Sequence, residues 1–416
     1  QLTDADMKFG NIADGKGNEL ELSNATFTTL LHDSVPEVRK SAFHQYYAQY
    51  ESHANTLAAT LSGSNERDAY AAKVRCHPSA VEAALFADNV PLAVYDQLIA
   101  AVRAHLPIVH RYYELRRRLL GLDEIHHYDC YVPLVPELEQ KHTWAEAIQE
   151  ITASLQPLGT EYCDQLEAGL RGRWCDRYPN VGKQSGAFSS GTYDSDPYIL
   201  MNFQEDVIEH VFTLAHEAGH SMHTRLSADA QPFQYAGYTI FVAEVASTFN
   251  EQLLTRHLLS KAHSPKQRAA IISREIDAIR GTIIRQTMFA EFERMSHSSV
   301  ESGEPLTLEK IRTIYRELLT AYFGSGFAID EELELESLRI PHFYRAFYVY
   351  KYATGLSASI ALSKRVTEGG PKELAAYLQF LRGGCSKWPL DLLRDAGVDL
   401  ETPEPVGLAL TRFGEL

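Results

Sequence analysis

The sequence predicts a mainly α fold with a small β-sheet. Apolar residues recur at helical spacing over most of the chain, whereas strand-like alternation is confined to two short stretches. The chain has 416 residues, of which 45% are hydrophobic and 23% charged, as is usual for a globular protein. This length is too great for one simple core, so we expect one large two-lobed domain or two or three domains.

The clearest helix is expected over residues 36–50. Asp33 and Ser34 supply capping side chains before it, and Pro36 stands where the first helical turn tolerates proline. Its apolar and aromatic residues then recur at helical spacing: Val38, Ala42, Phe43, Tyr46, Tyr47 and Tyr50. Similar patterns predict helices over about 80–120, 143–173, 205–227, 240–262, 265–300, 307–323, 341–365 and 371–382.

Strand signals are few. Residues 17–23 alternate weakly, and residues 183–203 are typical of a hairpin. The hairpin has a Gly/Ser-rich half, a turn rich in Asp and Pro, and a run of β-favouring residues. Because it leads directly into the helix predicted from residue 205, we expect a small sheet beside that helix.

The charge and the cysteine content restrict the partners and the cellular compartment that we expect. The formal net charge is −16 and no Lys/Arg-rich run is present, so we expect no nucleic-acid partner. The five cysteines are scattered without a C-x-x-C pair, which favours a reducing compartment, most simply the cytoplasm. No run of 18 apolar residues and no signal peptide are found, so no membrane partner is expected. Since the first residue is Gln1, we expect a processed or truncated chain.

The predicted helix 205–227 contains His-Glu-Ala-Gly-His. Its histidines, His216 and His220, lie on one helix face about one turn apart, which suits chelation of one small cation. Glu217 can take a proton from a zinc-bound water and later give it to a leaving amine. Zinc lowers the pKa of that water toward neutrality. The alternative is two satisfied core histidines, although the apolar flanks of the motif make such a burial costly.

A catalytic zinc needs a third protein ligand and one open position. Glu244 is the only charged residue between Thr239 and Phe249, and a lone carboxylate there must be paired, protonated or metal-bound. It follows His220 by 24 residues, which is enough for a loop and a returning helix. A structural ion pair is the alternative. Ser247 and Thr248 are expected to support the ligands without binding the metal, and His223 is expected to extend the polar rim of the site.

The chain resembles the M3 family of metallopeptidases, and within it the oligopeptidase F branch (thimet oligopeptidase-like). The residues that carry the resemblance span almost the whole sequence. They are Phe27–Leu31, Ser185–Tyr193, His216–His223, Phe241–Ser247, His342–Gly355 and Pro403–Val406. The resemblance implies a two-lobed helical metallopeptidase fold, with a small β-sheet beside a deep active-site channel. It also implies a zinc-dependent endopeptidase that hydrolyses short unfolded peptides and excludes folded proteins.

The resemblance also assigns roles to residues. One zinc ion per chain is held by His216, His220 and Glu244, and Glu217 is the general base. A later His and Tyr side chains stabilise the tetrahedral intermediate. Here His342 matches the histidine, and we choose Tyr348 and Tyr352, which are four apart, over Tyr350, with Tyr344 as a structural candidate. Substrate-binding candidates are Gly186, Ala187 and Phe188 of the hairpin, which would add a peptide strand, and Gly237 and Tyr238.

We divide the chain into a helical lobe, 1–175, and a zinc-binding catalytic region, 176–416, whose C-terminal helices close the channel. Family members usually begin with a longer helical region, so part of the channel wall is expected to be missing from residues 1–175. Two other functions stay open: a peptide-binding protein without activity, and a zinc hydrolase of non-peptide amides. A structural zinc is disfavoured because such sites usually have four protein ligands and often cysteines.

Overall fold

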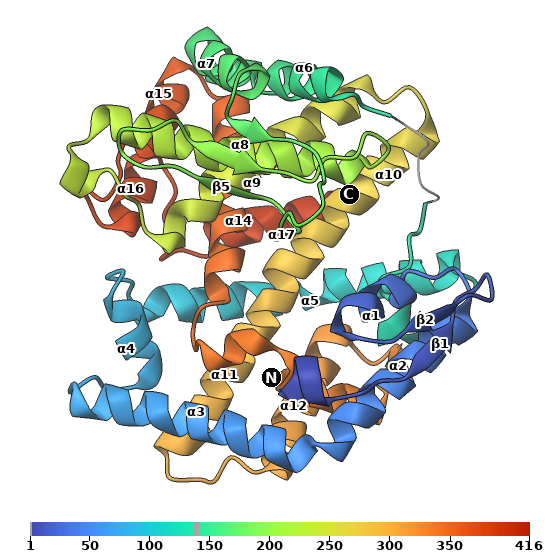
Figure 1. Cartoon of the computed structure of the whole chain (residues 1–416). Helices are drawn as coiled ribbons and strands as arrows, with labels where there is room; N and C mark the ends of the chain where they lie inside the picture. The colour runs from blue at the N-terminus through green and yellow to red at the C-terminus, as the bar shows by residue number, and fades with distance from the viewer. Residues whose placement is uncertain (1, 136–140) are drawn as a thin grey trace. The chain divides into compact units, whose positions relative to one another are not determined.

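The computed structural model describes residues 2–135 and 141–416, which are mainly helical with three small sheets (Figure 1). The chain forms two compact units, and each is assembled from three stretches. The first unit comprises Gln1–Phe86, Ile99–Pro136 and Gln286–Tyr350. The second comprises Ala87–Leu98, Glu137–Arg285 and Lys351–Leu416.

The expected division into residues 1–175 and 176–416 is therefore corrected, because the two units interleave along the chain. The reason is tertiary packing. The helices of residues 144–171 pack against the helices that follow the hairpin, and the helix of residues 308–323 packs against that of residues 54–74.

The helices of the first unit are α1 (Asn24–Leu31), α2 (Pro36–Ser52), α3 (Ala54–Val74), α4 (Ala80–Phe86), α12 (Leu308–Phe323), α13 (Glu336–Arg339), nearly all of α11 (Arg285–Glu301) and most of α5 (Leu92–Leu119). Two sheets belong to it. In one, β1 (Asn11–Ala13) pairs antiparallel with β2 (Glu19–Glu21), and in the other β3 (Ile125–His126) pairs parallel with β7 (Phe327–Ala328). The predicted apolar face of α2 is largely buried, but its N-cap is Val35, so Asp33 and Ser34 do not cap it.

The second unit carries α6 (Trp144–Ser154), α7 (Thr160–Arg171), α8 (Ile208–Ala230), α9 (Ile240–Lys261), α10 (Pro265–Ile279), α14 (Tyr350–Glu368), α15 (Pro371–Leu381), α16 (Pro389–Asp395) and α17 (Glu404–Glu415). Its sheet has the strand order β4 (Cys175–Asp176), β6 (Tyr198–Leu200), β5 (Phe188–Ser190). The antiparallel β5–β6 pair confirms the predicted hairpin and leaves β5 at the sheet edge. Both strands pack against α8, as expected.

Helices α8 and α9 lie against each other over much of their length (Figure 1). Gly219 permits this approach, because a Cβ atom there would lie 2.5 Å from the Ala246 carbonyl oxygen and 2.6 Å from Ser247 Cα. Asn250 of α9 also donates a hydrogen bond of 3.1 Å to the Ala215 carbonyl of α8. The close approach brings the functional side chains of the two helices together.

Several helix bounds differ from the prediction. The helix expected over 341–365 begins only at Tyr350, because Pro341 starts a 3-10 turn and Phe347 adopts a left-handed φ of 59°. The stretch 80–120 is divided near Asn89, which has a φ of 50°, and the stretch 143–173 is divided at Gly159, with a φ of 90°. Helix α3 was not predicted.

Helix α5 is long and apolar enough to cross a membrane, with an 18-residue window of mean hydropathy 1.3. The helix is not an unbroken apolar run, because it includes Asp96 and Arg103. Of that window, 44% is buried in the protein, and the helix contains Pro107. Because core helices of folded proteins satisfy the same criterion of length and composition, this helix is only weak evidence for a membrane span.

Candidate metal centre and active site

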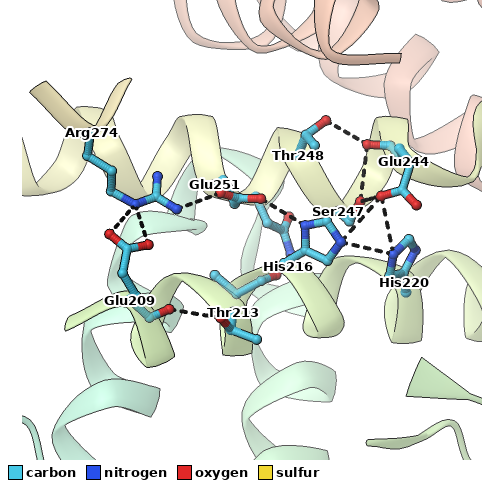
Figure 2. A network of polar contacts seen from close by, with 11 residues as sticks. Glu209, Thr213, His216, His220, Glu244, Ser247, Thr248, Glu251 and Arg274 are labelled. Carbon is cyan, nitrogen blue, oxygen red and sulfur yellow. Dashed lines mark hydrogen bonds and ion pairs between the residues drawn. The ribbon is translucent and has the colours of Figure 1, made fainter. Parts of the chain in front are cut away.

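Helices α8 and α9 bring the three predicted metal ligands together (Figure 2). His216 Nε2 and His220 Nε2 are 3.2 Å apart. Glu244 Oε2 lies 3.3 Å from His216 Nε2 and 3.6 Å from His220 Nε2. The side chains are 18–27% exposed, so the cluster is sheltered and still accessible.

These distances fit a zinc ion. With metal–ligand bonds of about 2.0–2.1 Å, adjacent ligand atoms of a tetrahedron are separated by about 3.3–3.4 Å. The separations of 3.2, 3.3 and 3.6 Å in the cluster are close to this value. Three protein ligands of two nitrogen atoms and one oxygen leave a fourth position open, which is the arrangement of catalytic zinc sites.

The ligands are held by further side chains. Ser247 donates a hydrogen bond of 3.0 Å to Glu244 Oε2, as expected, whereas Thr248 donates to the Glu244 backbone carbonyl. Glu251 Oε1 lies 2.8 Å from His216 Nδ1, a partner that the sequence analysis missed (Figure 2). The signal was its spacing, since Glu251 follows Glu244 by seven residues and therefore shares its helix face.

The pKa values of the three ligands are shifted, because the side chains are largely buried and lie beside one another. Burial lowers the pKa of His216, but hydrogen bonds to Glu244 and Glu251 outweigh this effect and raise it to about 10. Although burial raises the pKa of Glu244, the nearby histidines bring it down to about 2. Burial and the charge of His216 lower the pKa of His220 to about 4. Glu244 is thus ionised and His220 neutral, as a divalent cation requires of its donors, whereas His216 would release a proton when the cation binds.

Glu217 is 7% exposed, and Ser189 of β5 supplies a backbone hydrogen bond to its carboxylate. Burial raises the pKa of Glu217 above its ordinary value, while the charge of His216 and the Ser189 hydrogen bond oppose the rise. A second link between β5 and α8 joins the hydroxyls of Ser189 and Ser221 at 2.8 Å. The predicted base and the sheet edge are thus neighbours.

The substrate-binding candidates lie in two places. Gly186 and Ala187 precede β5, which begins at Phe188, and the Phe188 side chain is 43% exposed. Gly237 and Tyr238 lie just before α9, and the Tyr238 hydroxyl is 2.9 Å from that of Thr224 on α8.

His223, which was expected at a polar rim, is instead 1% exposed. It is stacked on the Tyr238 ring at a centroid distance of 3.7 Å. It lies outside the ligand cluster, as expected. Burial lowers the pKa of His223 to about 3, so its imidazole is neutral and behaves as a core aromatic ring.

The three residues predicted to stabilise the tetrahedral intermediate belong to both units of the chain. His342 and Tyr348 belong to the first unit, where their rings are nearly parallel at 5.9 Å. Because α14 begins at Tyr350, Tyr348 does not share a helix face with Tyr352, contrary to the prediction. Tyr352 belongs to the second unit and precedes Gly355 by one turn.

Gly355 marks the face of α14 that approaches the ligands, since a Cβ atom there would lie 3.5 Å from Glu244 Cβ. Tyr352 lies on this face. Of the other tyrosines, Tyr350 is 1% exposed, and the Tyr344 hydroxyl is 2.8 Å from that of Thr60 in the first unit, which suits a structural role.

The sequence profile of Peptidase family M3 matches residues 29–411. The chain belongs to peptidase family M3. Oligopeptidase PepF of Bacillus subtilis (strain 168) is 46% identical over 414 residues, which is all of this chain and 62% of that protein. An oligoendopeptidase F homolog of Borreliella burgdorferi is 42% identical and is matched over 67% of its length by 96% of this chain. This M3-family chain therefore spans a little under two thirds of the Bacillus relative.

Solved structures agree with this assignment. Oligoendopeptidase-F from Enterococcus faecium superimposes with a TM-score of 0.82 at 34% identity, covering all of this chain and 68% of that one. A Chlamydophila abortus protein superimposes with a TM-score of 0.94 at 38% identity, covering all of this chain and 69% of that one. The predicted family and the mainly helical fold class are confirmed.

Proposed function

We propose that this M3-family chain is a zinc-dependent endopeptidase that hydrolyses short unfolded peptides. The observation that carries the proposal is the ligand cluster of His216, His220 and Glu244, with mutual distances of 3.2–3.6 Å. Support for a peptide substrate comes from the relatives, which are named oligopeptidase PepF and oligoendopeptidase F. Zinc held here would supply a Lewis acid, which lowers the pKa of a water ligand and polarises a carbonyl oxygen.

Glu217 is the proposed general base and acid. It accepts the proton of the attacking water and returns it to the leaving amine as the peptide bond breaks. Its near-complete burial raises the pKa of its carboxyl, which strengthens Glu217 as the acceptor of the water proton.

The edge strand β5 is the proposed substrate platform. An extended peptide adds to it through main-chain hydrogen bonds, which accept varied side chains. Gly186, Ala187 and Phe188 form its leading end, and Ser189 joins this strand to the base Glu217. This contact would hold a peptide bond beside Glu217. Gly237 and Tyr238 are proposed as further substrate contacts.

Three residues are proposed to stabilise the negative charge that develops on the carbonyl oxygen. Tyr352 is supported by its place on the α14 face next to Glu244. His342 and Tyr348 are proposed from the family resemblance and from the close pairing of their rings. The proposed setting is the cytoplasm, since none of the five cysteines forms a disulfide in the described part of the chain, which suits a reducing compartment.

A quenched-fluorescent peptide of about ten residues tests the proposal. Cleavage should disappear on chelation and return with zinc. Glu217→Gln should keep its zinc and lose cleavage by about 100-fold or more. Stoichiometric zinc without cleavage by the unmodified chain would favour a binding protein, and cleavage of acyl amides but not peptides would favour a different hydrolase.

A further inference from the structure

Arg274 of α10 is connected to the metal ligand His216 through Glu251 (Figure 2). Glu251 uses one oxygen, Oε1, for His216 Nδ1 at 2.8 Å and the other, Oε2, for Arg274 Nη2 at 2.9 Å. Since Nε2 of His216 faces the other two ligands, its Nδ1 is the N–H donor to Glu251. The carboxylate of Glu251 is therefore held at both ends, by the ligand and by Arg274.

Arg274 is itself fixed from two more sides. Its Nε donates to both oxygens of Glu209 at 3.0 and 3.1 Å. Its guanidinium carbon lies 3.4 Å from the ring centroid of Phe212, which is 2% exposed. Planar stacking and a fork of donors are properties of arginine that lysine lacks. Helices α8, α9 and α10 meet at this one side chain.

The two carboxylates of Arg274 differ in burial. The side chain of Glu209 is 56% exposed, so water screens its attraction to Arg274. The side chains of Glu251 and Arg274 are 19% and 22% exposed, so water screens their electrostatic attraction less. Without Arg274, Oε2 of Glu251 would lose the hydrogen bond that it makes among the described residues, and the carboxylate could turn away from His216.

We propose that Arg274 is a positioning residue of the metal centre, which fixes the orientation and tautomer of His216 through Glu251. The proposal rests on the proposed metal site. Carboxylates that hold a ligating imidazole change metal affinity when they are lost. Here the carboxylate is itself oriented by a cation, so removal of Arg274 should act on metal binding without removing any ligand.

A purely structural role gives a different expectation. If Arg274 only clamps three helices, its loss lowers thermal stability and leaves the zinc affinity of the folded protein unchanged. The positioning role and the purely structural role can be distinguished experimentally, because the site of the Arg274 side chain is accessible from the surface. A pocket of about 300 Å³ opens beside Arg274, lined among others by Glu209, Phe212, Leu258 and Ile271. A free guanidinium ion can enter through it when the side chain is removed.

The experiment measures zinc affinity by competition with a chelator, for the unmodified chain, Arg274→Ala, Arg274→Lys and the matched control Glu209→Ala. We expect a loss of roughly 10–100-fold for Arg274→Ala and a smaller loss for Arg274→Lys. Glu209→Ala should change affinity by less than about fivefold, as expected for an exposed partner. Thermal unfolding of each zinc-free variant is recorded in parallel.

Guanidinium chloride, at concentrations far below those that unfold the protein, should restore zinc affinity to Arg274→Ala. Sodium chloride at equal ionic strength should not. An affinity loss below about fivefold for Arg274→Ala would overturn the proposal. So would a loss that guanidinium does not recover and that Glu209→Ala reproduces. Failure of the unmodified chain to bind zinc would instead overturn the proposed metal site.

Discussion

Replacing Gly219 by alanine should force apart the two helices that carry the metal ligands. The new Cβ atom would lie 2.5 Å from the Ala246 carbonyl oxygen and 2.6 Å from Ser247 Cα, whereas ordinary contacts begin at 3.4 Å. Relief of the closest contact requires a shift of 3.4 − 2.5 = 0.9 Å. Because the obstructing atoms belong to the backbone of α9, no side-chain rotation can provide it.

The shift would increase the distances between the metal ligands of the two helices. Glu244 Oε2 now lies 3.3 Å from His216 Nε2, and a separation of α8 from α9 by 0.9 Å would bring this distance to about 4.2 Å. That exceeds the edge of about 3.4 Å in a tetrahedral zinc site. Overpacking of this kind costs about 1–3 kcal/mol. If zinc binding must restore the original spacing, affinity should fall by about 5- to 150-fold.

Zinc titration against a competing chelator, with thermal unfolding of the zinc-free protein, measures both effects. Gly281→Ala is the matched control, because a Cβ atom at this helical glycine of the same unit would meet nothing within 4 Å. Its zinc affinity should stay unchanged. Unaltered affinity and stability in Gly219→Ala would refute the argument that the close helix contact sets the ligand geometry.

Three further outcomes are expected. Tyr352→Phe should lower kcat by on the order of 100-fold while zinc affinity is retained; equal loss of both would contradict the proposed role. Chelation should lower the melting temperature, since a ligand at 100 times its Kd stabilises the folded state by about 2.7 kcal/mol, and an unchanged value would argue against a bound metal. Burial raises the pKa of Glu293 well above its ordinary value, although the Phe347 N–H opposes this. The folded state then holds the proton that the unfolded state releases, so stability falls as pH rises above about 4. Urea unfolding should show Glu293→Gln gaining stability relative to the unmodified chain between about pH 4 and pH 8; a constant difference would contradict it.

The sequence predicted how side chains are spaced along one helix. It predicted contacts between helices less well. His216, His220 and Glu244 could be selected because two lie on one helix face and the third is a lone charge in an apolar run. The role of Glu251 depends on how α9 is rotated against α8. Its sequence spacing carried that signal, but only the structure shows that Glu251 reaches His216.

The errors in the fold have local and tertiary causes. Helix α3 was missed because its buried face includes small and polar residues such as Ala58, Ser64 and Asn65, which give a weak apolar periodicity. The start of α14 was misplaced because Phe347 takes a backbone conformation that nothing in its residue type indicates. The two interleaved units depend on packing between distant stretches, which periodicity does not report.

The interleaving also sets the order in which the protein can fold during synthesis. The first unit needs residues 286–350, whose first residue is translated 200 positions after Phe86. At about 5–20 residues per second, the first 86 residues wait roughly 10–40 s on the ribosome for their partners. During this time the aromatic face of α2 lacks part of its final cover, so the nascent chain should be a client for chaperones until the second half has been made.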